Sequence, residues 1–340
     1  MVPTVFGITL VIFCLLSAAP GDPATIKFGV FEQTQEGSDI QARIDKFNSR
    51  YGFNQPLWKQ YLSYLGPVNM KDDGHRWFGG TGREPWGGLL AFDLGSELLR
   101  PTVRVSEELT RRLAVTVPLS LVSALLSYMI ALPLGIYSAA RQGSLGDGLT
   151  SVSLFVLYSI PTFWAGLMLI LVFGKTGLDW FPSLGLHDKD ADLLSSGGYV
   201  WDMLKHAVLP VATLTYGSLA YLSRQMRVGM VDVIRQDYIR TARAKGLPER
   251  VVVLRHALRN SLIPVLTLFA SVLPILIGGS IIVEKVFDIP GMGSYAYEGL
   301  LERDINVVMA TTTFSAVMTL MGILLSDISY AFADPRIRYE

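Results

Sequence analysis

One polar stretch of the chain has residue types and a spacing suited to contact with another macromolecule. Between Arg227 and Arg259, eight Lys or Arg residues stand against three acidic residues, and apolar segments flank the stretch on both sides. Lys and Arg in short loops mark the cytoplasmic face of a bilayer, because they set the orientation of membrane helices. The composition therefore predicts a cytoplasmic loop rather than a site of covalent chemistry.

Within this stretch the residue order predicts two short helices joined by a tight turn. Residues 231–245 can form a helix that ends at Gly246, since glycine readily adopts the left-handed conformation that terminates helices. Pro248 can open a second helix, where its missing N–H is not needed, and Glu249 complements the positive end of that helix. Small residues cluster just before the turn, where a partner surface could approach closely: Thr241, Ala242 and Ala244.

Residues that could catalyse a reaction or hold a metal ion are scarce. The phosphate-binding pattern GxxxxGK[ST] does not occur in the sequence, which excludes ATP hydrolysis by that route. The apolar runs carry no ionisable residue near their middle, and Asp327, near the end of the last run, is expected to be an interfacial anchor. His206 and His256 have no second ligand at metal spacing and are expected to be interfacial polar anchors, and Cys14 lies alone in an apolar run. The sequence therefore predicts no catalytic residue, no metal site and a source of energy outside the chain.

The elements that position these residues are predicted to be membrane helices. Half of the 340 residues are hydrophobic, 17% are charged and the mean hydropathy is +0.39, whereas a soluble domain averages about 25% charged residues. The net charge is zero, which argues against nucleic-acid binding. Six runs without charged residues are each long enough to cross a bilayer, which takes roughly 17–25 residues. They predict an all-α polytopic membrane protein with six transmembrane helices, at 1–21 and at about 113–138, 150–174, 207–224, 262–283 and 305–328.

The distribution of charge among the loops predicts the orientation of these helices. The 224–259 loop is strongly basic, whereas the 175–206 and 284–306 loops carry more acidic than basic residues. Alternation of the helices then places both chain ends and the short 141–147 loop in the cytoplasm. The long segment 22–108 is expected outside the cytoplasm.

The N-terminal region allows two interpretations of its first apolar run. A cleaved signal peptide is the alternative to a first membrane helix, since small residues stand before a proline at 17–20, although no basic residue precedes the run. In the extracytoplasmic segment that follows, residues 40–65 show helical spacing that is broken at Gly52 and Pro56. Residues 66–91 are rich in Gly, Pro and Trp and predict an irregular loop.

Several sequence blocks, in the same order along nearly the whole chain, carry a resemblance to one family. They are AAPGDPA near the start, YGFNQPLWKQYL at 51–62, SIPTFWAGL at 159–167, KHAVLPVATL at 205–214, DYIRTARAKGLPERVVVLRHALRNSLIPVLT at 237–267, VEKVFDIPGMG at 283–293 and DPRIRY at 334–339. In these blocks the chain resembles ABC transporter permeases of the dipeptide/oligopeptide (peptide/nickel) importer branch, as the first of the two permease subunits. The resemblance implies the type I permease fold over 109–333, with an extracytoplasmic insertion between helices 1 and 2, a coupling loop at 225–260 and a cytoplasmic tail at 334–340.

In such permeases the basic loop resembles the EAA coupling element, which inserts into a groove of the ATP-hydrolysing subunit. Ala242 and Gly246 match the second Ala and the Gly of that motif, while Arg240 and Thr241 stand in place of its Glu and first Ala. Where the general pattern has a downstream proline, this chain has Arg259. The resemblance implies the following coupling residues: Arg240, Thr241, Ala242, Arg243, Ala244, Lys245, Gly246, Leu247 and Pro248.

The resemblance implies a transport subunit, not an enzyme, in a bacterial or archaeal cytoplasmic (inner) membrane. Such a subunit forms half of the translocation pathway of an ATP-driven importer for di- or oligopeptides. The implied partners are a homologous second permease, two ABC ATPase subunits that bind ATP-Mg, an extracytoplasmic solute-binding protein, the peptide substrate and the lipid bilayer. No cofactor is expected in this chain itself.

Other interpretations stay open at this point. Nickel or another small solute is the alternative substrate, because nickel permeases resemble this branch. An intramembrane enzyme needs catalytic groups at membrane depth, which the apolar runs lack. A receptor-like or assembly protein would have no ATPase partner. The basic loop could also be a solvated connector whose charge only sets the topology.

Overall fold

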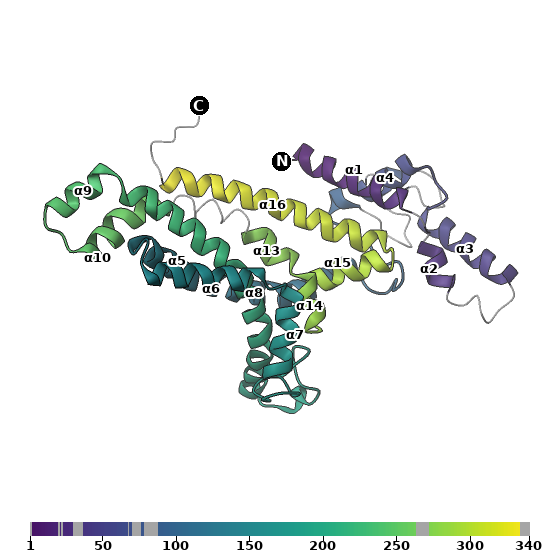
Figure 1. Ribbon diagram of the computed structural model, residues 1–340. Helices are drawn as coiled ribbons and strands as arrows, with labels where there is room; N and C mark the ends of the chain where they lie inside the picture. The colour runs from purple at the N-terminus through teal and green to yellow at the C-terminus, as the bar shows by residue number, and fades with distance from the viewer. Residues whose placement is uncertain are drawn as a thin grey trace. The chain divides into compact units, whose positions relative to one another are not determined.

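The computed structural model describes residues 2–19, 21, 23–29, 37–66, 68–69, 76–77, 88–262 and 272–333, and helices dominate this part of the chain (Figure 1). The chain divides into two compact units. The first unit comprises residues 1–114 and 295–317, and the second comprises residues 115–294 and 318–340. Helices α5 (Val105–Ala140) and α16 (Ile305–Ala333) each contribute residues to both units.

The first unit is built from short helices and one small hairpin. Its elements, besides the parts of α5 and α16, are α1 (Val2–Ala18), α2 (Pro23–Gly29), α3 (Gly37–Tyr51), α4 (Leu57–Leu65), β1 (Val68–Asn69), β2 (Arg76–Trp77), η1 (Leu89–Ala91) and most of α15 (Met292–Leu301). The two strands pair antiparallel, where the sequence predicted an irregular loop at 66–91. Much of that predicted loop lies outside the described residues.

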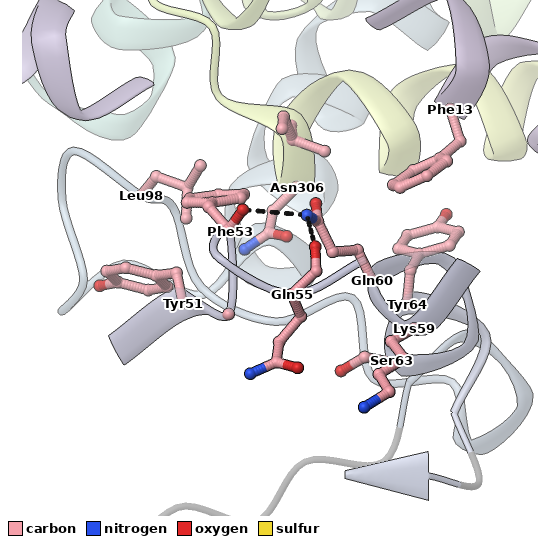
Figure 2. A pocket seen from close by; sticks show the side chains of 12 residues that line it. Phe13, Tyr51, Phe53, Gln55, Lys59, Gln60, Ser63, Tyr64, Leu98 and Asn306 are labelled. Atoms are coloured by element: carbon pink, nitrogen blue, oxygen red, sulfur yellow. Dashed lines mark hydrogen bonds between the residues drawn. The ribbon is translucent and has the colours of Figure 1, made fainter. Parts of the chain in front are cut away.

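The expected break between the helices of 40–65 is confirmed. Helix α3 ends at Tyr51, Gly52 follows with a φ of 73°, and Pro56 directly precedes α4. The side-chain amide of Gln60 closes this turn, because it donates to the carbonyl oxygens of Phe53 at 3.1 Å and Gln55 at 2.7 Å (Figure 2). A small hollow of about 60 Å³ lies beside the turn, which is room for a few water molecules.

Buried side chains join α4 to α16 within the first unit. Tyr64 packs with Phe13 and Met309, and its hydroxyl donates to the Met309 carbonyl oxygen at 3.3 Å. The same hydroxyl lies 3.0 Å from the Thr313 hydroxyl. Burial raises the pKa of Tyr64 to about 12, since the phenolate would lose its hydration. The extracytoplasmic segment of the sequence prediction therefore contains a packed core rather than a loose loop.

Asp304 caps the start of α16. Its carboxylate accepts hydrogen bonds from the backbone N–H groups of Leu98 at 2.5 Å and Val307 at 3.1 Å, and the residue is only 1% exposed. Burial raises the pKa of this carboxyl to about 6, because removal from water disfavours the ionised form. The folded pKa thus lies above the ordinary value of 3.8.

We expect the stability of Asp304→Asn relative to the wild type to increase as the pH rises towards 6, because the amide cannot ionise. In the wild type the stabilisation from this group is fully present below about pH 4 and is lost as the pH rises through the folded pKa, a change of about 3 kcal/mol. Thermal unfolding of both proteins in detergent between about pH 4.5 and 7.5 measures the difference. A difference that stays constant or shrinks with rising pH contradicts the expectation.

The second unit contains the long helices. Its elements, besides the remaining parts of α5 and α16, are α6 (Leu145–Ser159), α7 (Thr162–Phe173), η2 (Ala191–Leu193), α8 (Ser196–Ile234), α9 (Asp237–Ala244), α10 (Glu249–Val251), the π-helical turn η3 (Val252–Ala257), α11 (Leu258–Ser261), α13 (Val272–Gly278) and α14 (Ile281–Val286). The core of this unit forms where α5 and α8 meet the short helices that follow α8. These elements position the basic stretch.

Helices α6 and α7 replace the single helix expected at 150–174. The two are bent by 95° at a break that contains Ile160 and Pro161. Ile160 is extended, with a ψ of 123°, because the proline ring disfavours a helical conformation of the preceding residue. The Tyr216 hydroxyl donates to the Ile160 carbonyl oxygen at 3.1 Å and so pairs one backbone group near the break.

The number of membrane spans stays a prediction. In the described part of the chain, α5 and the Ile305–Ile328 part of α16 are long and apolar enough to cross a membrane, and the bent pair α6–α7 makes a third if it counts as one span. Helix α1 is apolar but has 17 residues, and the span expected at 207–224 lies within α8. The span expected at 262–283 includes 263–271, outside the described residues, and is interrupted between α13 and α14 by Gly279, whose φ is 65°.

Candidate functional site

The basic stretch begins on α8, which continues further than the sequence predicted. The first short helix starts at Asp237 instead of residue 231, because α8 runs on to Ile234. Val231, Val233 and Ile234 pack against the core of the second unit, and this packing favours continuing α8. The chain then turns at Gln236, whose ψ is 151°, and enters α9.

The turn between α9 and α10 confirms the predicted pair of helices. Gly246 has a φ of 76°, the left-handed conformation that glycine adopts without strain. Its N–H donates to the Arg243 carbonyl oxygen at 2.9 Å, and the N–H of Lys245 donates to that of Thr241 at 3.1 Å. Pro248 is the cap of α10 rather than its first residue, and its carbonyl oxygen accepts from Val251 at 2.8 Å. We call residues 237–251, which comprise α9, the turn and α10, the basic hairpin (Figure 1).

Buried residues anchor the basic hairpin to the second unit. Ile239 and Val252 are fully buried, and Ala242 is 7% exposed. They belong to a hydrophobic cluster that also contains Ala139 of α5 and Met226 and Met230 of α8. A hairpin held at both of its ends by a packed core moves with the helices that it touches.

Eight of the nine predicted coupling residues are exposed to solvent. The exception is Ala242, which is 7% exposed and packs in the cluster that contains Ala139 of α5 and Met226 of α8. The exposed residues are Arg240, Thr241, Arg243, Ala244, Lys245, Gly246, Leu247 and Pro248. No heavy atom lies within 4 Å of the position that a Cβ would take at Gly246. The tip of the hairpin is therefore open to a partner surface.

An ion pair closes the turn of the basic hairpin. Arg243 donates from Nε to Glu249 at 3.1 Å and from a terminal nitrogen to the same carboxylate at 2.6 Å. These hydrogen bonds lower the pKa of Glu249 and raise the pKa of Arg243. The sequence assigned Glu249 to the helix end but did not reveal its partner, because the pair forms only after the turn has reversed the chain.

We expect Arg243→Glu to reduce transport by the assembled transporter, because it places two carboxylates across the turn. The charge-exchanged double variant Arg243→Glu/Glu249→Arg restores the ion pair and should recover at least half of the loss if the pair acts by holding the turn. An exposed pair is worth about 0–1 kcal/mol, so the folded yield should hardly change. ATP-driven uptake in proteoliposomes provides the measurement. A double variant as inactive as Arg243→Glu would instead indicate that Arg243 contacts the partner directly.

A second ion pair joins three helices near the end of α8. Arg227 donates from Nε to Asp147 at 3.0 Å and to the Ser138 hydroxyl at 2.9 Å, and from a terminal nitrogen to Asp147 at 2.9 Å. Asp147 also accepts from Ser138 and from the Gly143 N–H. The side chains of Asp147 and Arg227 are 8% and 30% exposed. We call Ser138, Asp147 and Arg227 the three-helix clamp, since they lie on α5, α6 and α8.

Sequence reasoning missed the three-helix clamp. Ser144 stands three residues before Asp147, a spacing typical of a helix N-terminus, and its hydroxyl accepts from the Asp147 N–H at 3.2 Å. That spacing could have placed Asp147 at the start of a helix. No local signal marks Arg227 as its partner, because the two residues are 80 positions apart.

A cavity of about 400 Å³ lies next to the three-helix clamp. Hydroxyl and guanidinium groups line one part of it and aromatic rings another. The lining residues are Ser138, Thr150, Ser151, Leu154, Phe155, Tyr158, Ala220, Tyr221, Ser223, Arg224 and Arg227. Its mixed lining can accommodate both polar and apolar groups.

The block VEKVFDIPGMG at 283–293 contributes to a buried network of hydrogen bonds in the second unit. Glu284 is 5% exposed and accepts hydrogen bonds from the Thr116 hydroxyl at 3.1 Å and the Ser294 N–H at 2.6 Å. The Thr116 hydroxyl in turn accepts from the Met292 N–H at 2.8 Å. The carboxylate of Glu284 occupies the place where a Cβ at Gly291 would lie, which explains the glycine. The block therefore ties α14 to α5.

His206 has carboxylate neighbours that the sequence interpretation overlooked. Asp188, Asp202 and His206 each offer one ligand atom, and these atoms lie within 4.8 Å of one another. The expectation that His206 has no second ligand at metal spacing is therefore wrong. Asp202 precedes His206 by four residues, one turn of α8, and this spacing was the available signal.

The described elements define the class of protein, an all-helical chain apart from one small hairpin, with helices long and apolar enough to cross a membrane. A chain of the MetNI methionine ABC transporter, solved in inward-facing conformations, superposes with a TM-score of 0.52. The alignment covers 67% of this chain and 96% of that chain at 17% sequence identity. At that identity the likeness shows the fold alone.

Comparison of the sequence with known proteins identifies the family to which the chain belongs. The family described as "Binding-protein-dependent transport system inner membrane component" matches residues 131–339. The oligopeptide transport system permease protein AppB of Bacillus subtilis (strain 168) is 39% identical over 99% of this chain and 96% of its own length. The di/tripeptide transport system permease protein DppB of Pseudomonas aeruginosa (strain UCBPP-PA14) is 34% identical over 100% of this chain and 96% of its own length. The chain belongs to the family of binding-protein-dependent transport system inner membrane components.

Proposed function

We propose that the chain is the membrane-spanning permease subunit of an ATP-driven importer for di- or oligopeptides, and that it forms half of the translocation pathway. The observation that carries this proposal is the basic hairpin, whose tip is exposed while Ile239 and Val252 fix its base in the core. The relatives with peptide-permease names extend over nearly the whole chain and support the peptide substrate.

The basic hairpin acts as the coupling element in this proposal. An ATPase subunit receives the exposed residues of α9 and the turn in a groove on its surface. When two ATPase subunits close on ATP-Mg, the hairpin transmits the movement to α8, because its buried side pulls on Met226 and Met230. The three-helix clamp passes the movement from α8 to α5 and α6. This chain performs no covalent chemistry in the cycle.

The proposed topology follows the charge of the loops. Residues 1–21 form the first membrane helix, 22–108 lie outside the cytoplasm and 109–333 form the transmembrane domain. The coupling loop at 225–260 and both termini, including the tail at 334–340, lie in the cytoplasm. A homologous second permease completes the pathway, and an extracytoplasmic binding protein delivers the peptide.

Reconstitution of the complete transporter tests the proposed function. The permease, its second permease, the ATPase subunits and the binding protein are placed in proteoliposomes, and uptake of labelled di- and oligopeptides is measured with and without ATP. Nickel uptake, measured in the same vesicles, tests the alternative substrate. ATP-dependent peptide uptake is the expected result. Solute movement by the purified chain alone, without nucleotide or another subunit, would overturn the proposal.

A further inference from the structure

A cluster of histidine and aspartate side chains lies where the loop after α7 meets the beginning of α8. Asp188 comes from the loop, whereas Asp202 and His206 lie one turn apart on α8. His206 Nε2 lies 4.0 Å from an Asp188 carboxylate oxygen, and His206 Nδ1 lies 3.4 Å from one of Asp202. His187 stands beside them, with its Nδ1 3.6 Å from Asp202 Oδ2. All four residues belong to the second unit.

The hydrogen bonds of His206 leave one ring nitrogen available as a ligand. Its Nδ1 lies 2.9 Å from the backbone carbonyl oxygen of Asp202, and a carbonyl oxygen can only accept. Nδ1 therefore carries a hydrogen, and in the neutral ring Nε2 has a lone pair directed towards Asp188. Metal-binding histidines are typically oriented in this way, since the nitrogen that does not bind the metal donates to an oxygen. The His206 side chain is only 2% exposed, which holds the ring in this orientation.

His187 adds a second imidazole at the edge of the cluster. Its Nε2 lies 2.8 Å from the Tyr199 hydroxyl, and its ring stacks on the Tyr199 ring at 4.2 Å between centroids. Its Nδ1 is buried and has no hydrogen-bond partner among the residues that the structure describes. A buried polar atom without a partner is uncommon in a folded protein and calls for an explanation. A cation bound near Asp202 would explain this unpaired nitrogen, because Nδ1 would then be one of its ligands.

We propose that these residues form a binding site for one divalent transition-metal ion of the Zn²⁺ type, with Asp188, Asp202 and His206 as ligands and His187 as a fourth. Imidazole nitrogen with carboxylate oxygen suits such ions, whereas Mg²⁺ and Ca²⁺ prefer oxygen alone. Bonds of about 2.0–2.2 Å place tetrahedral ligand atoms roughly 3.4 Å apart. The ligand atoms of Asp188, Asp202 and His206 lie within 4.8 Å of one another, and His206 Nε2 lies 4.0 Å from Asp188, so the side chains must move towards the ion to reach that value.

The burial pattern permits entry of an ion from one side. The side chains of Asp202 and His206 are 10% and 2% exposed, whereas that of Asp188 is 58% exposed. Lys175 competes with the ion, since its ammonium lies 3.9 Å from the Asp188 carboxylate. This lysine is 69% exposed and can withdraw into solvent. An ion can therefore reach the site through the Asp188 side.

The site lies at the opposite end of α8 from the basic hairpin. Along its contour, α8 rises about 42 Å from His206 to Ile234. A bound ion would tie the loop at 187–188 to α8 and fix the outer end of that helix. The proposal concerns a resident ion and does not depend on whether the permease carries peptides or nickel.

Metal titration of the purified full-length chain in detergent tests the site. The protein is purified with a tag that contains no histidine and is freed of metal with a chelator. Zn²⁺ binding is measured by calorimetry, and Co²⁺ is added separately to obtain a visible absorption spectrum, which reports a nitrogen- and oxygen-ligated ion. We expect about one ion per chain and a higher unfolding temperature with Zn²⁺.

Matched variants separate a metal site from a simple polar cluster. His206→Gln, Asp202→Asn and the exposed Asp188→Asn should each weaken Zn²⁺ binding at least tenfold. His256→Gln removes a histidine elsewhere in the second unit and should leave binding unchanged. Lys175→Gln should tighten binding, by about fivefold or less, because it removes a competing charge. If His206→Gln does not fold, Zn²⁺ binding by Asp188→Asn tests the proposal in its place. The absence of Zn²⁺ and Co²⁺ binding in the wild type, or equal binding in all variants, overturns the proposal.

Discussion

Replacing Gly246 with Asp is expected to abolish ATP-coupled transport while leaving the amount of folded protein close to that of the wild type. The φ of Gly246 is 76°, and the position of its missing Cβ is surrounded by open space. Asp is among the residues that enter the left-handed region most readily, so the backbone cost is about 1 kcal/mol. The new carboxylate instead projects from the tip of the basic hairpin, where we propose that an ATPase subunit packs.

The expected size of the effect follows from the energetics of buried interface residues. A residue at the centre of an interface contributes about 2 kcal/mol or more, so the affinity between permease and ATPase should fall roughly thirtyfold. ATP-dependent uptake and permease-stimulated ATP hydrolysis, both measured in proteoliposomes, should therefore fall together. Co-purification of the ATPase subunits with the permease should weaken as well.

Gly52→Asp provides a control for the backbone conformation and the added charge of this variant, although Gly52 is buried and Gly246 is exposed. Gly52 has a φ of 73°, and no heavy atom lies within 4 Å of its missing Cβ, but it belongs to the first unit and is not part of the basic hairpin. The same strain and charge at Gly52 should leave ATPase stimulation unchanged. Survival of both transport and stimulation in Gly246→Asp would show that the hairpin is not the coupling element.

Removing the carboxylate of the three-helix clamp should destabilise the folded protein. Asp147→Ala leaves the Arg227 guanidinium without its partner, and Ser138 and the Gly143 N–H lose an acceptor. Breaking a fully buried pair costs about 3–5 kcal/mol. Because the Arg227 side chain is 30% exposed, we expect about 2 kcal/mol here. Thermal unfolding in detergent measures this loss, and transport should fall because α8 loses its ion pair with α6.

A second substitution distinguishes loss of stability from loss of coupling. Asp147→Ala/Arg227→Met removes the unpaired charge and should recover much of the unfolding temperature, since a buried ion pair can be exchanged for apolar contacts. Transport should remain low, because the helices still lack their polar connection. Full recovery of transport in the double variant would argue against a role for the clamp in transmitting movement.

An exposed ion pair on the basic hairpin is the control for the clamp. Asp237 and Arg240 are 3.5 Å apart, and their side chains are 96% and 73% exposed. Asp237→Ala should change the unfolding temperature little, since an exposed pair contributes about 0–1 kcal/mol. An equal loss of stability in Asp147→Ala and Asp237→Ala would contradict the description of the clamp as a buried connection.

Features that depend on the conformation of one or two residues were predictable from the sequence. Glycine and proline restrict or relax the backbone by themselves, and so Gly52 with Pro56, and Gly246 with Pro248, correctly located two turns. At Pro161 the long run without charges predicted one continuous span, whereas the helices on either side of this proline are bent by 95°. A run without charged residues indicates an apolar environment, but it does not show that one continuous helix spans the run.

The ends of the long helices were harder to predict. The span expected at 207–224 is part of α8, which extends from Ser196 to Ile234. Charged residues delimit an apolar run, but they do not end a helix when their side chains reach solvent or a partner, as Arg227 does. Packing of Val233 and Ile234 against the core then carries α8 into the region that the sequence assigned to the first short helix.

The sequence by itself determined the membrane character of the chain, the family resemblance in its ordered blocks and the basic, turn-containing stretch. These depend on residue types and on local backbone sterics, which act within a few positions. Only the tertiary structure decided that Ala242 faces the core, that Asp147 pairs with Arg227 and that Asp188 approaches His206. Such pairings depend on which faces of distant helices pack together, and this packing cannot be predicted from a local sequence pattern.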